Sequence, residues 1–257
     1  GLPGPGLHRR AHHRFRRGTT ALRRLPIAIE ADTFFESTTW RLDGPAPQRI
    51  SLPPKATVQG LHRGHIVATL EEAWQGLPQG AVIAYPLNET SSETPHATAL
   101  FAPTARQSIE GVAITRDAIL VAGFENVRGR ILRIARDDQR WTTTTLDLPQ
   151  TGAVTFAGSS PTESEAFAVY EDYLTPDTLY ALERGATTTR AVRSLPAQFD
   201  ASPYVTEQFE AVSRDGTRVP YFILHRRDMQ LNGQNPTLLY AYGGFQVSET
   251  PAYSPNV

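Results

Sequence analysis

Short runs of apolar and β-branched residues, separated by turn residues, occupy the chain from about residue 26 to about residue 199. The clearest runs span 34–42, 49–52, 66–70, 81–87, 112–115, 119–124, 130–134, 166–170 and 178–181. Dipeptides typical of tight turns, such as Arg63-Gly64 and Arg128-Gly129, lie between them. No segment keeps a helical period of apolar positions for long. The pattern predicts a mainly β chain, and it leaves a sandwich and a propeller equally open.

A β-hairpin is predicted for residues 205–226. Its arms, 208–213 and 218–224, flank a turn in which Gly216 is free to adopt positive φ. Pro220 lies in the second arm and has no backbone N–H to donate, so we expect an edge position or a bulge there.

The next apolar run, 237–242, predicts a buried strand that ends in Gly243-Gly244. Paired glycines let the backbone turn sharply and approach a ligand closely. In one interpretation this is a strand and a turn, with Tyr240 and Tyr242 hydrogen-bonded in the core. In the other, the strand end carries a functional site.

Composition narrows the possible functions. The 257 residues include 25 Lys and Arg against 26 Asp and Glu, which gives a net charge of −1 and favours neither nucleic acid nor a membrane as partner. The chain has no cysteine, and no apolar run approaches eighteen residues, so we expect no disulfide and no transmembrane helix. The sequence leaves the localisation undetermined between cytoplasm and periplasm.

The first 25 residues differ from the rest of the chain. They are rich in arginine and poor in apolar residues, so we expect residues 1–25 to be a disordered or misassigned segment. His8, His12 and His13 lie there without a nearby Cys, Asp or Glu, and we therefore predict a solvated basic tail and no metal site.

Three later segments carry a family resemblance. They are Asp215-Gly-Thr-Arg-Val-Pro-Tyr-Phe-Ile-Leu224, Asn235-Pro-Thr-Leu-Leu-Tyr-Ala-Tyr-Gly-Gly-Phe245 and Glu249-Thr-Pro-Ala-Tyr-Ser-Pro255. In order and spacing they closely resemble the entry into the catalytic domain of the prolyl oligopeptidase family of serine peptidases. In addition, residues 167–180 look like the stretch that closes a propeller blade in this family, and 40–44 with 65–74 are similar to an earlier blade.

The resemblance implies a partial β-propeller of about three to four blades, followed by the first strands of an α/β-hydrolase domain. The domains expected are the segment 1–25, a propeller part at 26–204 and a truncated peptidase domain at 205–257. Because the family's propeller has seven blades, we expect the first half to be missing. An open array leaves an apolar blade face in water, which predicts poor solubility or partial order for the isolated chain.

The resemblance also implies a Ser, Asp, His triad, with the serine in a G-x-S-x-G elbow. The sequence contains no such elbow, and Ser159 and Ser160 are expected to be loop residues. His225 does not match the family's histidine, and His62, His65 and His96 are expected at the surface or in packing. We therefore expect the triad beyond residue 257 and this chain alone to be inactive.

Two site residues carry over from the family. Tyr242 matches the tyrosine whose hydroxyl donates to the developing oxyanion, and Phe245 matches an aromatic residue that lines the pocket for the substrate's proline ring. No cofactor and no metal are implied, because acyl transfer by serine needs neither.

The function implied is a serine oligopeptidase that cleaves short peptides after proline, with a propeller that excludes folded proteins and a monomeric parent protein. An oligopeptidase B-like enzyme with basic specificity is the first alternative, and Gly244-Phe245 after Tyr242 favours the proline-selective branch over it. A non-enzymatic propeller that serves as a binding scaffold is the second.

Overall fold

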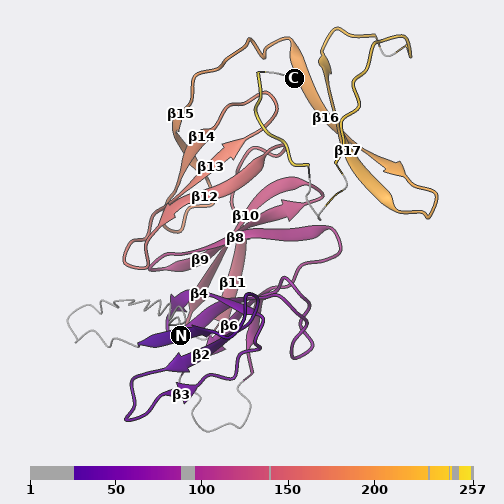
Figure 1. Ribbon diagram of the computed structural model, residues 1–257. Helices are drawn as coiled ribbons and strands as arrows, with labels where there is room; N and C mark the ends of the chain where they lie inside the picture. The colour runs from indigo at the N-terminus through magenta and orange to yellow at the C-terminus, as the bar shows by residue number, and fades with distance from the viewer. Residues whose placement is uncertain are drawn as a thin grey trace, which may run out of the picture.

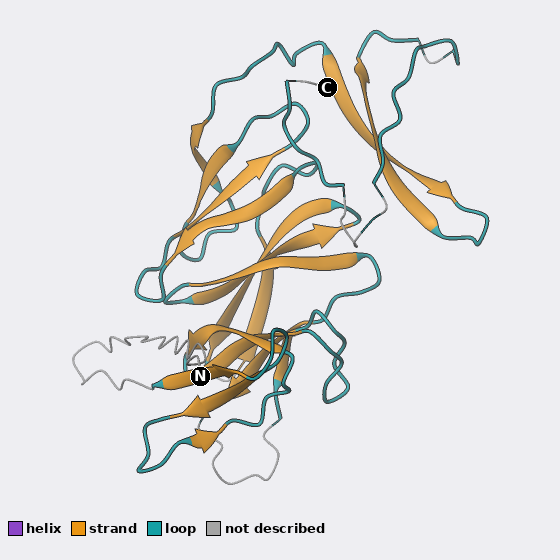
Figure 2. Ribbon diagram, viewed as in Figure 1, coloured by secondary structure: helices purple, strands orange, loops and turns teal. Residues whose placement is uncertain are grey.

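A computed structural model describes residues 26–87, 96–138, 140–230, 232–242, 244 and 249–255. Every regular element in these ranges is a β-strand (Figure 2). Accordingly, no helix that could cross a membrane occurs in this part of the chain. The expected segment 1–25, with His8, His12 and His13, lies outside the described residues.

The strands form four antiparallel sheets and a hairpin, in chain order. The first sheet contains β1 (Ile27–Ala31), β2 (Ser37–Arg41) and β3 (Gln48–Arg49). The second sheet contains β4 (Ala56–His62), β5 (His65–Leu70), β6 (Val82–Pro86) and β7 (Thr98–Phe101). The third sheet contains β8 (Gln107–Ile114), β9 (Ala118–Glu125), β10 (Arg128–Asp137) and β11 (Arg140–Thr145). The fourth sheet contains β12 (Ala153–Ser159), β13 (Ala166–Glu171), β14 (Thr178–Leu182) and β15 (Arg190–Ser194).

In each sheet, strands that follow one another in sequence are hydrogen-bonded neighbours. A four-stranded antiparallel meander is the unit of a propeller blade. Figure 1 shows the four sheets following one another from the indigo sheet at the bottom to the salmon sheet that contains β12–β15 above. The prediction of a mainly β chain with about three to four blades is confirmed, and the sheets do not close into a ring.

The central strands of the second and third sheets, β5, β6, β9 and β10, are largely buried on both faces. Alternate residues of β5 belong to different cores, because Ile66, Ala68 and Leu70 pack toward the first sheet whereas Val67 packs toward the third. The same alternation separates Leu120 from Val121 in β9. Side chains of a strand point to opposite faces in turn, so a continuous apolar run is what two-sided burial requires.

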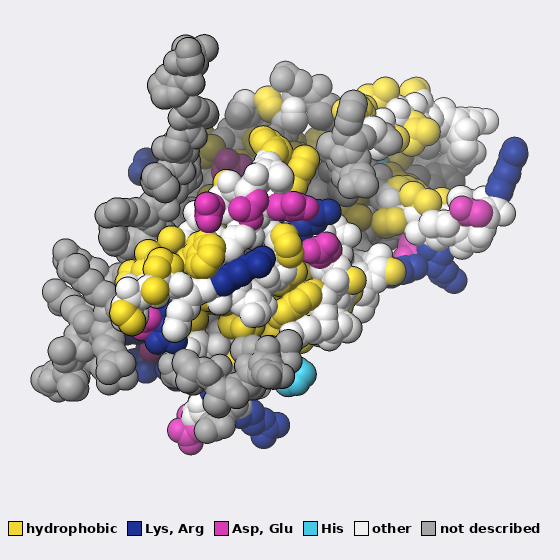
Figure 3. All heavy atoms as spheres, turned by 60° about the horizontal axis from the view of Figure 1, so that its bottom comes forward, with side chains coloured by type: hydrophobic (Ala, Val, Ile, Leu, Met, Phe, Trp, Pro, Cys, Tyr) yellow, Lys and Arg dark blue, Asp and Glu magenta, His cyan; other side chains and the backbone are white. Residues whose placement is uncertain are grey.

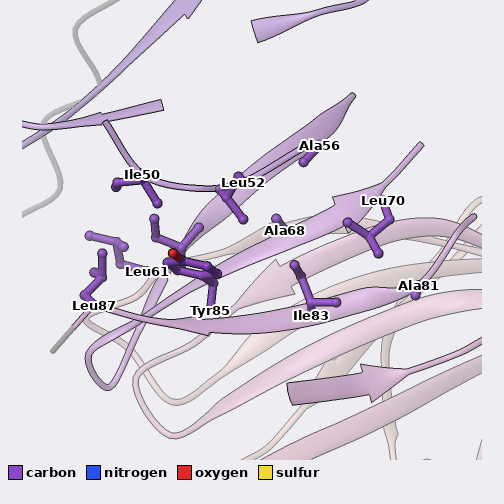
Figure 4. Packing of buried hydrophobic residues seen from close by; sticks show 11 residues of the cluster. Ile50, Leu52, Ala56, Leu61, Ala68, Leu70, Ala81, Ile83, Tyr85 and Leu87 are labelled. Carbon is purple, nitrogen blue, oxygen red and sulfur yellow. The ribbon is translucent and has the colours of Figure 1, made fainter. Parts of the chain in front are cut away.

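Three hydrophobic cores fill the spaces between successive sheets. Figure 4 shows the first of them, where side chains from the segment after β3 meet those of β4, β5 and β6. Its labelled members are Ile50, Leu52, Ala56, Leu61, Ala68, Leu70, Ala81, Ile83, Tyr85 and Leu87. Burying apolar surface between neighbours is the main source of stability for such a stack.

A β-bulge recurs in the first strand of each four-stranded sheet. The register shifts between Val58 and Gly60 in β4, between Ile109 and Gly111 in β8, and between Phe156 and Gly158 in β12. One extra residue in a strand bends it and increases its twist. The three bulges thus curve equivalent strands in the same way.

Apolar side chains are exposed on the first sheet. Figure 3, which brings the bottom of Figure 1 forward, shows hydrophobic side chains gathered on this face beside acidic ones. Phe34 and Phe35, in the loop between β1 and β2, are 93% and 76% exposed and contact each other edge to face. They lie beside a hollow of about 600 Å³ that Lys55 and Glu71 also line.

The predicted hairpin is formed by β16 (Tyr204–Val212) and β17 (Arg218–Arg226), which pair antiparallel throughout. Gly216 has φ of +85°, as the turn requires. Pro220 faces Glu210 in this two-stranded sheet. Because each strand of such a sheet is an edge strand, the predicted edge position of Pro220 is confirmed.

The strand predicted for 237–242 is wrong. These residues form no strand, and Leu238, Leu239 and Tyr240 are 85%, 88% and 75% exposed. A strand needs a neighbour for its backbone groups, and no strand in the described ranges pairs with this segment. The segment is apolar, but its burial would depend on a partner strand that composition alone does not reveal.

Candidate functional site

Tyr242 is half-exposed, and its ring folds back over the backbone of Gly244. Its side chain is 48% exposed. A Cβ atom built on Gly244 would lie 2.9 Å from the phenolic oxygen and 3.1 Å from Cζ. Cβ atoms do not approach other atoms that closely, so glycine at position 244 is what permits this placement of the phenol. Tyr242 belongs to none of the three hydrophobic cores of the described residues.

Phe245, the second predicted site residue, lies outside the described residues, as does Gly243. Tyr240 was expected in a structural role in the core, and its exposure contradicts that expectation. The site therefore rests on Tyr242, on Gly244 and on the elements that attach this part of the chain to the sheets.

The hairpin is attached to the third sheet by polar side chains. Gln208 of β16 donates from Nε2 to the backbone oxygen of Asn126 at 2.6 Å. The Nε of Arg128 donates to Oε1 of Gln208. Asn126 and Arg128 flank the turn between β9 and β10, so a single glutamine side chain contacts both sides of that turn.

A second set of contacts surrounds Glu210. Its Oε1 accepts from Nη1 of Arg106 at 2.5 Å, and its Oε2 accepts from Nη1 of Arg218 at 3.1 Å. These two arginines hold the pKa of Glu210 below its usual value, first through the hydrogen bond from Arg218 and then through that from Arg106. Arg106 also donates to Oδ1 of Asn126 at 3.1 Å. Glu210, on β16, is thus charged at neutral pH and links Arg218, at the start of β17, to Arg106, just before β8 of the third sheet.

The turn held by these contacts has an unusual backbone. Asn126 and Val127 have φ of +49° and +62°. Asparagine tolerates this left-handed region, whereas a β-branched residue rarely adopts it and loses about 1–3 kcal/mol by doing so. A cavity of about 470 Å³ lies between this turn and β16, lined by Glu125, Asn126, Arg128, Arg130, Gln208, Phe209 and Glu210.

An aromatic contact attaches the hairpin to the fourth sheet. The rings of Tyr173, in the turn between β13 and β14, and Phe222 of β17 meet edge to face with centroids 5.6 Å apart. Burial, followed by the charge of Glu249, raises the pKa of the Tyr173 hydroxyl. The hairpin therefore spans the corresponding turns of two adjacent sheets.

Among the described residues, His62, His65 and His96 have the surroundings of packing or surface side chains. His62 is 2% exposed, and burial, followed by the charge of Arg63, lowers its pKa to about 4. His65 contacts Arg136 and the ring of Trp141. His96 lies at the surface. The expectation that these three serve packing or lie at the surface agrees with their positions.

His225 takes part in an ion pair of the hairpin. Its Nε2 lies 2.9 Å from Oε2 of Glu207, and its Nδ1 lies 2.8 Å from the backbone oxygen of Arg226. The hydrogen bond to Glu207, and then that to Arg226, raise the pKa of the imidazole. Both ring nitrogens can donate only when the ring is protonated, so the cationic form suits this site.

Neither serine of the weak candidate motif has the setting of a nucleophile. Ser159 ends β12, and Ser160 follows it in a loop, where its Oγ lies 2.8 Å from Oγ1 of Thr162. A nucleophile elbow joins a strand to a helix, and no helix follows β12 in the described chain. The described residues contain no group of side chains suited to hold a metal ion.

Comparison with known proteins gives this architecture a family. The profile of the prolyl oligopeptidase N-terminal β-propeller domain matches residues 53–194, which is more than half of the chain. The chain belongs to the prolyl oligopeptidase family. The matched residues begin just before β4 and end with the last residue of β15, so they contain the three four-stranded sheets and leave out the hairpin and Tyr242.

Curated relatives are much longer than this chain. An uncharacterized peptidase of Sinorhizobium fredii is 32% identical over 212 residues, which are 80% of this chain and 29% of the relative. A prolyl endopeptidase of Elizabethkingia miricola is 33% identical over 109 residues, which are 42% of this chain and 16% of that protein. This chain thus spans less than a third of the length of these curated relatives.

A solved structure of a post-proline cleaving enzyme from Rickettsia typhi superposes with a TM-score of 0.71 and 29% identity. The match covers 90% of this chain and 35% of that one, so it includes most of the residues after β15 as well.

Sequence reasoning identified Tyr242 but missed the residues that attach its segment to the sheets. Gln208 and Glu210 lie in a strand and Asn126 lies in a turn, and nothing in the sequence around them shows that they meet. Tyr253 lies in the family-like segment 249–255, but no role of its own could be assigned to it from the sequence.

Proposed function

We propose that this chain is part of a serine peptidase that cleaves short peptides on the carboxyl side of proline. In this proposal residues 26–204 supply part of the propeller, and residues 205–257 begin the catalytic domain. The supporting relatives are a prolyl endopeptidase and a post-proline cleaving enzyme. The observation that carries the proposal is the half-exposed phenol of Tyr242, held over Gly244 and outside the three hydrophobic cores of the described residues.

The role proposed for Tyr242 is to donate a hydrogen bond to the oxyanion. When a serine attacks a peptide carbonyl, the oxygen gains negative charge only in the transition state, so a fixed O–H there lowers the barrier selectively. Tyrosine suits this task because its rigid ring fixes the position of a hydroxyl that can donate a hydrogen bond. Phe245, two positions after Gly243, is proposed to contact the proline ring.

The serine, aspartate and histidine of the triad are proposed to lie in a part of the parent protein outside these 257 residues. The chain by itself is then expected to be inactive, and no metal or organic cofactor is needed for acyl transfer to a serine. The propeller is proposed to restrict access to short peptides.

The test uses the full-length gene product and chromogenic peptides with proline, lysine or arginine before the leaving group. We expect turnover of the proline peptide, inhibition by a serine-directed reagent, and a loss of about 100- to 1,000-fold in kcat for Tyr242→Phe. Preference for the basic peptides would support the oligopeptidase B-like alternative. An absence of any turnover would support the scaffold and overturn the proposal.

A further inference from the structure

Tyr253 joins two parts of the chain that are far apart in sequence. Its ring stacks on Phe199, with centroids 5.2 Å apart and planes inclined by 8°. Its hydroxyl oxygen accepts a hydrogen bond at 2.8 Å from the backbone N–H of Gln198, 55 positions earlier. The residues just before the hairpin and those after Tyr242 therefore meet at one point.

The same residue is attached to the fourth sheet. The backbone N–H of Tyr253 donates to Oε2 of Glu171 at 2.8 Å, and Glu171 is the last residue of β13. Pro251 is buried nearby in the sequence, and Glu249 is close enough to Tyr173 for its charge to affect that phenol's pKa. Residues 249–253 thus lie along the turn that follows β13, whereas Leu238, Leu239 and Tyr240 before them are exposed.

The contact to Gln198 needs the hydroxyl of Tyr253, whereas the contact to Glu171 uses a backbone N–H that any residue other than proline supplies. The stack on Phe199 fixes the plane of the Tyr253 ring. The hydroxyl fixes the ring relative to Gln198, and the backbone N–H fixes the position of the Tyr253 backbone beside the end of β13. A charged acceptor such as Glu171 makes the last of these contacts stronger than a neutral one.

We propose that Tyr253 is a positioning residue for the proposed peptidase reaction, which fixes the segment carrying Tyr242 on the fourth sheet through Phe199, Gln198 and Glu171. This inference rests on the proposed function. Tyr242 must be aimed at one oxygen atom of the substrate, and a misplacement of about 1 Å can cost about 100-fold in rate. Attachment at Tyr253 and at the hairpin restrains the segment from both sides.

The first experiment measures attachment without any activity. Amide hydrogen exchange is followed in this chain for wild type, Tyr253→Ala and Tyr253→Phe. We expect residues 249–255 to exchange about tenfold faster in Tyr253→Ala, because an aromatic stack and its burial are lost. Tyr253→Phe keeps the stack and the backbone N–H and should change exchange much less. Phe34→Ala, which removes an exposed aromatic ring from the first sheet, is the matched control and should leave these residues unchanged.

The second experiment measures positioning in the full-length gene product. Active sites are first titrated with a serine-directed reagent, so that kcat refers to folded enzyme only. We expect Tyr253→Ala to lower kcat about 10- to 100-fold with a smaller change in KM, and Tyr253→Phe to recover most of it. A merely structural role would lower the number of titrated sites and leave kcat per site unchanged.

The two proposals fail in different ways. If wild type shows no turnover of any peptide, both are overturned. If wild type turns over the proline peptide and Tyr253→Ala has an unchanged kcat per titrated site, the positioning role alone is overturned, and the proposed function stands. Unchanged exchange of residues 249–255 in Tyr253→Ala would also overturn it.

Discussion

The side-chain amide of Gln208 donates to the backbone oxygen of Asn126 at 2.6 Å, across 82 positions of sequence. Replacing Gln208 with alanine removes this bond and the acceptor of Arg128, and should weaken attachment of the hairpin by about 1–3 kcal/mol. We expect faster amide exchange in β16 and β17 and in the turn at Asn126, with little change in the second sheet.

Thr206→Val on the same strand is the control for that experiment. The Oγ1 of Thr206 is buried and has no hydrogen-bond partner, so replacing the hydroxyl with a methyl group should leave the hairpin as stable or stabilise it by about 1 kcal/mol. Equal exchange in Gln208→Ala and Thr206→Val would show that the contact to Asn126 does not hold the hairpin.

A methyl group at position 244 should displace the phenol of Tyr242. In Gly244→Ala the new Cβ would lie within 3.1 Å of both the phenolic oxygen and Cζ, so the ring must move. We expect the NMR signals of fluorotyrosine at position 242 to shift. Gly158→Ala is the comparison, because nothing lies within 4 Å of a Cβ there. An unchanged Tyr242 signal in Gly244→Ala would contradict the close approach.

His62 should make the chain less stable in acid. Its pKa in the folded state is about 4 because of burial, whereas an unfolded histidine titrates near 6.5. The unfolded chain therefore binds a proton first as the pH falls. Stability is full above about pH 6.5 and is lost between about pH 6.5 and pH 4, by about 3 kcal/mol at an order-of-magnitude level. Urea unfolding at pH 7 and pH 4.5 measures this loss.

The non-titrating variant His62→Gln should show a smaller loss of stability between those two pH values. Groups near His62 include Arg63, His65 and Asp117, and their charges act on the same histidine. If wild type and His62→Gln lose stability in parallel as the pH falls, His62 does not remain neutral in the folded chain.

His225 should have the opposite pH dependence. Its pKa is raised in the folded state by Glu207 and by the backbone oxygen of Arg226. The stabilisation is therefore fully present below about pH 6.5 and is lost as the pH rises through the raised pKa. An NMR titration should give His225 a pKa above 6.5 in wild type and a lower one in Glu207→Gln. A pKa that is the same in both would exclude Glu207 as the cause.

The exposed aromatic residues of the first sheet should promote self-association of the isolated chain. If Phe34 and Phe35 were buried in a contact between two chains, each would stabilise that contact by about 1.5–3 kcal/mol. We expect Phe34→Ser with Phe35→Ser to raise the dissociation constant for self-association by at least tenfold in sedimentation velocity. Val192→Ser, at a half-exposed position of β15, should have little effect. A wild-type chain that stays monomeric at high concentration would contradict this expectation.

The sheets and the hairpin could be predicted from the sequence because their signals are local. Apolar runs such as 119–124 coincide with strands, and the pair Arg63-Gly64 forms the turn between β4 and β5. The turn expected at Arg128-Gly129 is wrong by two residues: it lies at Asn126 and Val127, and Arg128 and Gly129 belong to β10. Gly216 and Pro220 predicted the hairpin through equally local signals. The strand expected at 237–242 was wrong because a strand needs a second segment to pair with, and the apolar run gave no information about such a partner.

The candidate site was predictable only in part. Tyr242 was predicted through a motif around adjacent glycines, and its role stays a prediction. Gln208, Asn126 and Tyr253 could not be found, since each acts through a contact across 55 to 82 positions of sequence, and no local pattern encodes the partner. Long-range polar contacts of this kind form because the fold brings the partners together, so the sequence near either partner does not predict them.

The bulges at Gly60, Gly111 and Gly158 matter most where both faces of a sheet are apolar. In a sheet with one wet face, a slip of one residue would expose the core side chains, and hydrophobicity alone prevents it. In β5 or β9 a slip of one residue would exchange two apolar faces. Both faces are buried, so hydrophobicity would not disfavour the slipped register. The bulges at these glycines then help to define the register of the strands. An insertion or deletion beside one of them should therefore be far less tolerated than a change of side chain.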